Sequence, residues 1–177
     1  LAITFTNKAA GELKERLSAM LGPAAEDIWA STFHSACVRI LRRDIDKLGF
    51  SSSFTIYDTD DSLRVVKDCL KELELDEKQF PPRSVLGYIS RAKDAMKLAQ
   101  DYLAECEKAG DFRLTKIARV YVEYQRRLWE ASALDFDDII LHTVRLLQQF
   151  DDVREYYQRK FRYVLIDEYQ DTNNLQY

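Results

Sequence analysis

The chain has 177 residues, 46% hydrophobic and 32% charged, so it can bury a core and remain soluble. Its few glycines and prolines, five and three, argue against disorder and against a sandwich with many turns. The net charge is −4, and no apolar run approaches the roughly 20 residues that cross a bilayer. The three cysteines lack the paired spacing of a zinc site, and an odd count is a poor disulfide framework, so reduced thiols are predicted.

The first third of the chain alternates strands and helices. Residues 1–5 form an apolar run typical of a buried strand, and Thr6 or Asn7 can cap the helix that follows. Gly22-Pro23 should end that helix, and residues 28–32 predict a second strand. The inward face of this first helix is predicted to hold four apolar residues, Ala10, Leu13, Leu17 and Met20.

A second helix should follow and end at Gly49, and residues 54–57 predict a third strand. The inward face of the helix is predicted from Val38, Leu41, Ile45 and Leu48. The order strand, helix, strand, helix, strand implies a parallel sheet with helices on its faces.

Beyond residue 58 the pattern becomes helical. Asp58 can cap a helix with Leu63, Val66, Leu70 and Leu73 inward, and another helix should begin after Pro81-Pro82, with Val85, Ile89, Ala92 and Met96 inward. A long helix is expected at about 113–131, and two helical stretches near 135–148 and 151–160. Residues 163–166 are continuously hydrophobic, as in a buried parallel strand.

This pattern predicts a helical subdomain inserted into an α/β domain. The expected boundaries assign residues 1–58 and 132–177 to the α/β part, and residues 59–131 to the insertion. Charge is also uneven: residues 83–128 carry ten Lys or Arg against six Asp or Glu, while residues 129–177 carry five against ten. A basic block beside an acidic one fits a phosphate-binding surface next to a metal-binding one, although most such excesses are solvated faces.

The acids Asp167 and Glu168 follow the last predicted strand directly. Two carboxylates at the carboxyl edge of a parallel sheet lie where open α/β sheets bind ligands. In a nucleotide-hydrolysing motor the first acid holds Mg²⁺ and the second orients and deprotonates the attacking water. The plainer alternative is a strand that ends in a polar turn.

Four segments carry a family resemblance, in the family's own order. Asp-Glu-Tyr-Gln-Asp-Thr-Asn at 167–173 resembles motif II of the UvrD/PcrA/Rep-like superfamily 1 DNA helicases, and Leu-Ala-Ile-Thr-Phe-Thr-Asn-Lys-Ala-Ala at 1–10 resembles motif Ia. Thr-Phe-His-Ser at 32–35 resembles motif Ib, and Leu-Asp-Phe-Asp-Asp at 134–138 resembles the segment before motif II. The resemblance spans the chain, and includes the 88–93 stretch typical of the family's inserted 1B subdomain. It implies a truncated parallel RecA-like sheet of the P-loop NTPase type, with an inserted all-helical subdomain.

The resemblance also implies residue roles. Phe5 would stack on a base of single-stranded DNA, with Thr6 and Asn7 beside it, and Thr32, His34 and Ser35 would contact the DNA backbone. Asp167 would hold Mg²⁺, Glu168 would be the catalytic base, and Gln170 would contact the nucleotide. From the residues alone, a core side chain is the favoured interpretation of Phe5, because it ends a predicted buried strand, and a lone His is more often structural.

Three basic residues of the insertion, Arg91, Lys93 and Lys97, lie on one predicted helix and are expected to meet duplex DNA. A solvated basic face is the equal alternative. The acidic run 135–138 could suggest a second metal site, but it precedes a helix and is better placed to cap it.

The nucleotide loop ending in Gly-Lys-Thr or Gly-Lys-Ser does not occur in the 177 residues. The sequence is therefore expected to be an internal piece of a cytoplasmic, nucleoid-associated bacterial helicase acting in DNA repair or replication. ATP, Mg²⁺, single-stranded DNA, duplex junctions and repair or replication proteins are expected for the intact protein. The piece alone should be inactive. The alternatives are the motor of a RecB/AddA-like helicase-nuclease, a helical insertion that serves as a protein-interaction platform, and a metal-dependent nuclease built on Asp167, Glu168 and Asp171.

Overall fold

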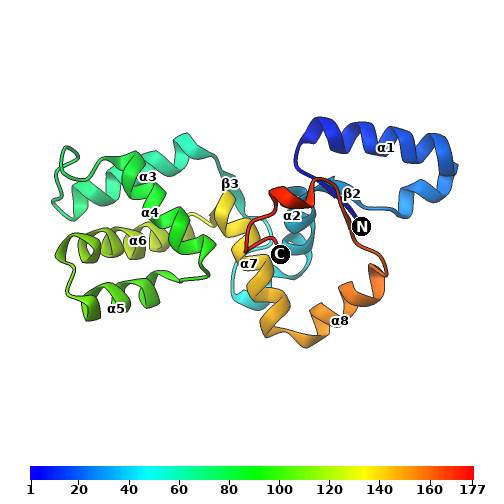
Figure 1. Cartoon of the computed structure of the whole chain (residues 1–177). Helices are drawn as coiled ribbons and strands as arrows, with labels where there is room; N and C mark the ends of the chain where they lie inside the picture. The colour runs from blue at the N-terminus through cyan, green and yellow to red at the C-terminus, as the bar shows by residue number, and fades with distance from the viewer. The chain divides into compact units, whose positions relative to one another are not determined.

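The computed structural model describes all 177 residues, and they divide into two compact units (Figure 1). The first unit comprises Leu1–Ser52 and His142–Tyr177, and the second comprises Ser53–Leu141. No helix is both long enough and apolar enough to span a lipid bilayer.

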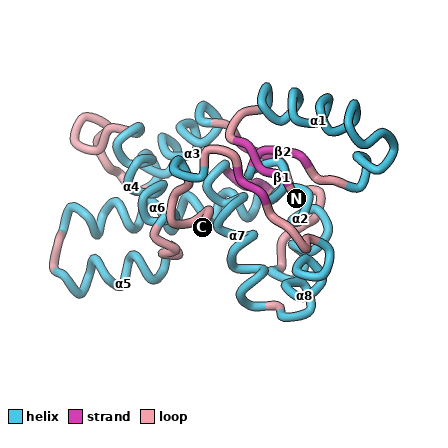
Figure 2. The backbone as a smooth tube through the Cα atoms, turned by 45° about the vertical axis from the view of Figure 1, so that its right-hand side comes forward, coloured by secondary structure: helices cyan, strands magenta, loops and turns pink.

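The first unit contains a parallel three-stranded sheet in the order β2-β1-β5. Figure 2 shows β1 and β2 as neighbouring strands, and Ile3 of β1 lies opposite both Ser31 of β2 and Ile166 of β5. The elements of this unit are β1 (Ala2–Thr4), α1 (Asn7–Leu21), the 3-10 helix η1 (Gly22–Asp27), β2 (Ala30–Thr32), α2 (Phe33–Asp44), the 3-10 helix η2 (Ile45–Leu48), α8 (Asp151–Lys160), β5 (Leu165–Ile166) and the 3-10 helix η3 (Tyr169–Asp171).

The second unit is a helical bundle with one small parallel ladder. Its elements are β3 (Thr55–Tyr57), α3 (Thr59–Glu72), α4 (Pro82–Asp94), α5 (Ala99–Ala109), α6 (Phe112–Glu130) and β4 (Ala133–Asp135). Helix α7 (Phe136–Gln149) begins in this unit and ends in the first. The core is drawn from α3, α4 and α6, and its largest fully buried members include Tyr121, Tyr124 and Ile89.

The parallel α/β fold with an inserted helical block is confirmed, but four details of the elements differ from expectation. The 54–57 strand does not join the main sheet, because β3 pairs with β4, a strand that the sequence pattern did not predict. Helix α5 was not predicted either. Leu73 lies at the end of α3, one-third exposed. Of the predicted inward face of α1, only Ala10 is buried, and Met20 is 79% exposed.

The expected buried strand at 163–166 is wrong in extent and in burial. Only Leu165 and Ile166 form β5, and the side chains of Tyr163, Val164 and Leu165 are exposed. The strand β5 lies at an edge of the sheet, hydrogen-bonded to β1 alone. The expected subdomain boundaries at 58/59 and 131/132 fall inside the second compact unit, and the subdomain assignment stays a prediction.

Candidate functional site

The carboxyl ends of the three parallel strands meet at one edge of the main sheet. Thr4 lies opposite Thr32, and Ile3 lies opposite Ile166. The residues that follow these pairs therefore leave the sheet on the same side, so Phe5 and Asp167 share one edge with the start of α2. This register brings motif Ia, motif Ib and motif II to one place.

Asp167 and Glu168 form an exposed turn directly after β5. The Asp167 amide donates to the Ile3 carbonyl at 2.9 Å, which continues the ladder, and the Asp167 carboxylate accepts from the Glu168 amide at 3.0 Å. Glu168 has φ of +51°, a left-handed conformation that few non-glycine residues adopt. The chain therefore turns sharply after β5, and both acids lie at the solvent side of the edge.

The Asp167 carboxylate is the side chain at this edge that could bind a magnesium ion. No group of three or more His, Cys, Asp or Glu side chains is arranged to hold a metal ion. Mg²⁺ in nucleotide sites binds one or two carboxylates and completes its shell with water and phosphate oxygens. The donor set fits a magnesium-nucleotide complex, and does not fit the metal site that the nuclease alternative needs at Asp167, Glu168 and Asp171. Gln170 is exposed in η3, one turn further on.

The first turns of α1 and α2 both begin at this edge, and a threonine caps each. The Thr6 hydroxyl accepts from the Ala9 amide at 3.1 Å. The Thr32 hydroxyl accepts from the Ser35 amide at 3.2 Å and donates to the Ser35 hydroxyl at 3.0 Å. A cap satisfies only one of the unpaired amides of a helix start, so both helices still offer N–H groups to an anion. Asn7 is exposed and His34 is half-buried in these first turns.

Phe5 is half-buried and packs against Phe33, with ring centroids 5.5 Å apart and planes tilted by 55°. The sequence interpretation assigned Phe5 but missed Phe33. Both aromatics directly follow strands that pair in register at Thr4 and Thr32, and this pairing is seen only in the structure. The edge therefore carries two aromatic rings, which is a suitable platform for unstacked bases.

Lys93 is wrongly predicted as a DNA contact. Its side chain is fully buried, and its ammonium lies 2.6 Å from the Asp135 carboxylate and 2.9 Å from the Asp138 carboxylate. The sequence carried a signal for this, since Lys93 follows Val85 and Ile89 at intervals of four on the buried stripe of α4. Lys93 therefore belongs to the core of the second unit.

The carboxylates around Lys93 are themselves fully bonded. Asp135 also accepts from the Tyr124 hydroxyl at 2.7 Å, and Asp138 accepts from the Gln125 amide at 3.3 Å. Asp135 and Asp138 exchange hydrogen bonds with each other's backbone amides, at 2.8 Å and 3.2 Å, so the predicted capping of the following helix is confirmed for this pair. Burial disfavours the charge on Lys93, but the two carboxylates outweigh it and raise the Lys93 pKa well above its ordinary value.

The other two basic residues predicted to meet duplex DNA remain at the surface of the second unit. Arg91 is exposed, with its guanidinium 4.5 Å from the centre of the Tyr88 ring. Lys97 is partly exposed and forms an ion pair with Glu105 at 2.6 Å. An exposed pair of this kind is weak, so Lys97 can exchange Glu105 for a phosphate.

Comparison with known proteins gives one consistent result. The model of the UvrD/REP helicase N-terminal domain matches residues 1–177. The chain is 52% identical to the ATP-dependent DNA helicase PcrA of Bacillus subtilis (strain 168), over its whole length. It is 51% identical to PcrA of Staphylococcus aureus (strain Mu50 / ATCC 700699) and 50% identical to PcrA of Staphylococcus epidermidis, again over all 177 residues. It spans 24% of the length of each of these relatives.

Proposed function

The chain belongs to the UvrD/REP helicase N-terminal domain family, and from this premise we propose that it is part of an ATP-dependent DNA helicase. The whole protein would translocate on single-stranded DNA and unwind duplex DNA in repair or replication, in the bacterial cytoplasm. This segment would supply part of the DNA track and the acidic end of the nucleotide site. The observation that carries the proposal is the shared edge of three strands paired in register, where Phe5 follows β1, Thr32 ends β2 and Asp167 follows β5.

The DNA-binding role rests on side chains that bind any base. Phe5 and Phe33 would stack on bases, and the first turns of α1 and α2, with Thr6, Asn7, Thr32, His34 and Ser35, would hold phosphates. Neither type of contact depends on the identity of the base, which is what a translocating protein needs.

At the nucleotide side, Mg²⁺ bound with ATP would neutralise charge on the transferred phosphate. Asp167 would hold the metal, Glu168 would orient the attacking water and accept its proton, and Gln170 would contact the nucleotide. Both acids directly follow β5, and the left-handed conformation of Glu168, with φ of +51°, makes the chain turn at this edge. In a protein that combines this segment with a nucleotide-binding loop, Glu168→Gln should lower ATP turnover by about 100-fold or more and leave DNA binding intact.

The DNA-binding proposal is tested on the 177-residue chain with a labelled oligothymidylate and fluorescence anisotropy. Phe5→Ala should weaken binding by about 5- to 150-fold, since one base–aromatic stack contributes about 1–3 kcal/mol. Phe112→Ala is the matched control, because Phe112 is 85% exposed and lies in the second unit. Equal affinities of the wild type and Phe5→Ala for oligothymidylate would contradict the role of Phe5 in DNA binding.

We also propose that the 177-residue chain alone hydrolyses no ATP, because its sequence contains no Gly-Lys-Thr or Gly-Lys-Ser loop to hold the phosphates. A steady-state phosphate-release assay with and without single-stranded DNA measures this directly. DNA-stimulated turnover, or micromolar affinity for ATP, would contradict it.

The role of the helical insertion needs its own test. Charge reversal at Arg91 and Lys97 in the intact protein, with Lys93 left in place, should weaken binding to duplex junctions. Unchanged junction binding would contradict the DNA role of this surface, and loss of a repair or replication partner alongside it would favour the interaction platform.

A further inference from the structure

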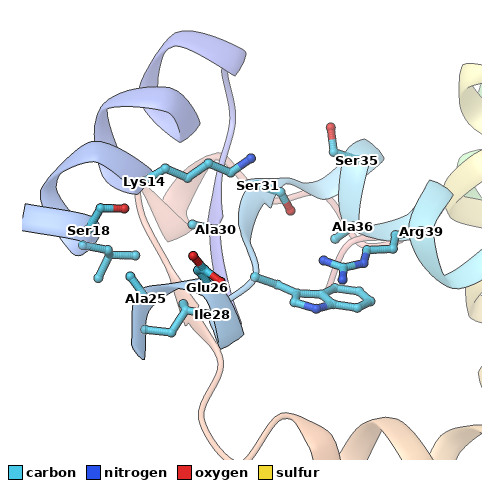
Figure 3. Close-up of a pocket in the computed structure, with 12 residues that line it drawn as sticks. Lys14, Ser18, Ala25, Glu26, Ile28, Ala30, Ser31, Ser35, Ala36 and Arg39 are labelled. Atoms are coloured by element: carbon cyan, nitrogen blue, oxygen red, sulfur yellow. The ribbon is translucent and has the colours of Figure 1, made fainter. Parts of the chain in front are cut away.

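A pocket of about 400 Å³ lies in the first unit between α1, η1, β2 and the start of α2 (Figure 3). Apart from Ser35, none of its lining residues has a role in the proposed function. Trp29, which is 9% exposed, forms part of its wall, and the Ser31 hydroxyl faces it, whereas the Ser35 hydroxyl points away (Figure 3). The pocket therefore combines an aromatic surface with polar hydrogen-bonding groups.

Two cations from different helices line this pocket without a carboxylate partner. Lys14 extends from α1 across the pocket towards Ser31 (Figure 3), and neither it nor Arg39 of α2 forms an ion pair. The Arg39 guanidinium lies 3.9 Å from the centre of the Trp29 ring. This cation–π contact restricts the guanidinium before any ligand arrives, so less side-chain entropy is lost when it binds an anion.

One acid opposes these cations. Glu26 of η1 also lines the pocket, and its carboxylate points inward beside Ala30 in Figure 3. The lining therefore carries two positive charges and one negative charge, which favours a ligand with a single negative charge. A phosphodiester has this charge and offers two oxygens to donors on opposite sides of the pocket.

The pocket adjoins the proposed DNA edge through a shared residue. Ser35 lines the pocket, and its amide is the group that the Thr32 hydroxyl caps. A DNA strand with a phosphate at the start of α2 would therefore have its next phosphates near Lys14 and Arg39. We propose that this pocket binds a backbone phosphate of single-stranded DNA beyond the Phe5–Phe33 platform, an inference that rests on the proposed DNA-binding function.

The chain provides its own reporter for this pocket. It has two tryptophans, so a Trp129→Phe background leaves Trp29 as the only one. Trp29 emission is then followed during titration with oligothymidylate, with an oligothymidylate of uncharged methylphosphonate linkages, and with inorganic phosphate. Oligothymidylate should change the emission at concentrations where anisotropy reports binding, and the uncharged analogue should not.

Substitution of the basic and of the acidic lining residues should change the affinity for oligothymidylate in opposite directions. Lys14→Gln and Arg39→Gln should each weaken oligothymidylate binding and reduce its salt slope by about 0.7, the value for one lost phosphate contact on a single strand. Glu26→Gln should tighten binding, because it removes repulsion of the phosphate. Lys71→Gln is the matched control: it makes the same charge change on an exposed residue of α3, in the second unit.

The outcomes separate this pocket from the proposed function. If Phe5→Ala weakens binding while the pocket variants and Trp29 emission do not respond, the pocket inference is overturned and the Phe5 track stands. If the pocket variants act and Phe5→Ala does not, the pocket stands and the role of Phe5 fails. Emission changes with inorganic phosphate but none with oligothymidylate, or no DNA binding at all, would also overturn the pocket inference.

Discussion

A buried lysine between two buried aspartates is an unusual residue-scale feature, because burial of each charge costs several kcal/mol of solvation. Lys93 is 0% exposed, Asp138 1% and Asp135 4%, so water screens none of the three charges effectively. Hydrogen bonds from Tyr124 and Gln125 satisfy further carboxylate oxygens. The three charges compensate one another, so removal of any one side chain should strongly lower the free energy of unfolding.

We predict that Lys93→Ala lowers the free energy of unfolding of the second unit by about 3–5 kcal/mol, because it leaves two carboxylates buried without a cation. Lys97→Ala is the control, since its ion pair with Glu105 is partly exposed and contributes about 0–1 kcal/mol. Urea denaturation followed by circular dichroism measures both. Similar stabilities of the two variants would contradict the structural role of Lys93.

The same lysine predicts a loss of stability at alkaline pH. Its folded-state pKa lies well above the ordinary value of 10.5, so its contribution is complete below that pH and is lost as pH rises through the folded-state pKa. Thermal unfolding from pH 7 upwards should show a fall beyond about pH 10.5 that is shallower in Lys93→Met. A wild type and variant that fall in parallel would show that Lys93 does not cause the loss.

The placement of the site residues could be predicted from the sequence only where neighbours along the chain decide it. Asp167 and Glu168 follow an apolar strand, and their placement at the sheet edge was predicted correctly. Lys93 was misplaced because its charge was weighed above its position on the apolar stripe of α4. Its acidic partners lie more than 40 residues further on, and only the fold brings them together.

At the scale of single elements, helix starts were predictable because their hydrogen bonds are local. Thr6 caps α1 and Asp58 caps α3, in both cases through the amide three residues ahead. Asp58 and Asp61 bond each other reciprocally. The strand β3 was predicted at the right residues but in the wrong sheet, β4 was not predicted, and β5 was predicted too long. Strands of two or three residues carry no periodic signal, and their pairing depends on distant segments.

The cap of α2 gives a prediction that separates folding from DNA binding. Thr32→Ala should cost about 1 kcal/mol of stability, because the Ser35 amide loses its acceptor, while Thr32→Ser should cost little. If Thr32 acts on DNA mainly through the cap, Thr32→Ser should also keep full affinity for oligothymidylate and Thr32→Ala should not. Equal losses of affinity in both variants would show that the Thr32 methyl group, and not the cap, matters for binding.

At the scale of the whole molecule, the two compact units differ in continuity along the chain. The first is assembled from both ends of the sequence, whereas the second is the single segment Ser53–Leu141. The second unit holds its own core, with Leu70, Ile89 and Tyr124 fully buried, and its own charged cluster around Lys93. The residues of this core and of this charged cluster thus all belong to one continuous segment of the chain.

This continuity predicts that residues 53–141, produced alone, fold cooperatively. The segment retains the β3–β4 ladder, the core of α3, α4 and α6, and all three charges of the Lys93 cluster. Circular dichroism should therefore record a helical spectrum and a single sigmoidal thermal transition, and Lys93→Ala should abolish or strongly lower that transition. A broad, non-cooperative melt of the wild-type segment would mean that its core requires residues 1–52 or 142–177, and that the insertion is not an independent folding unit.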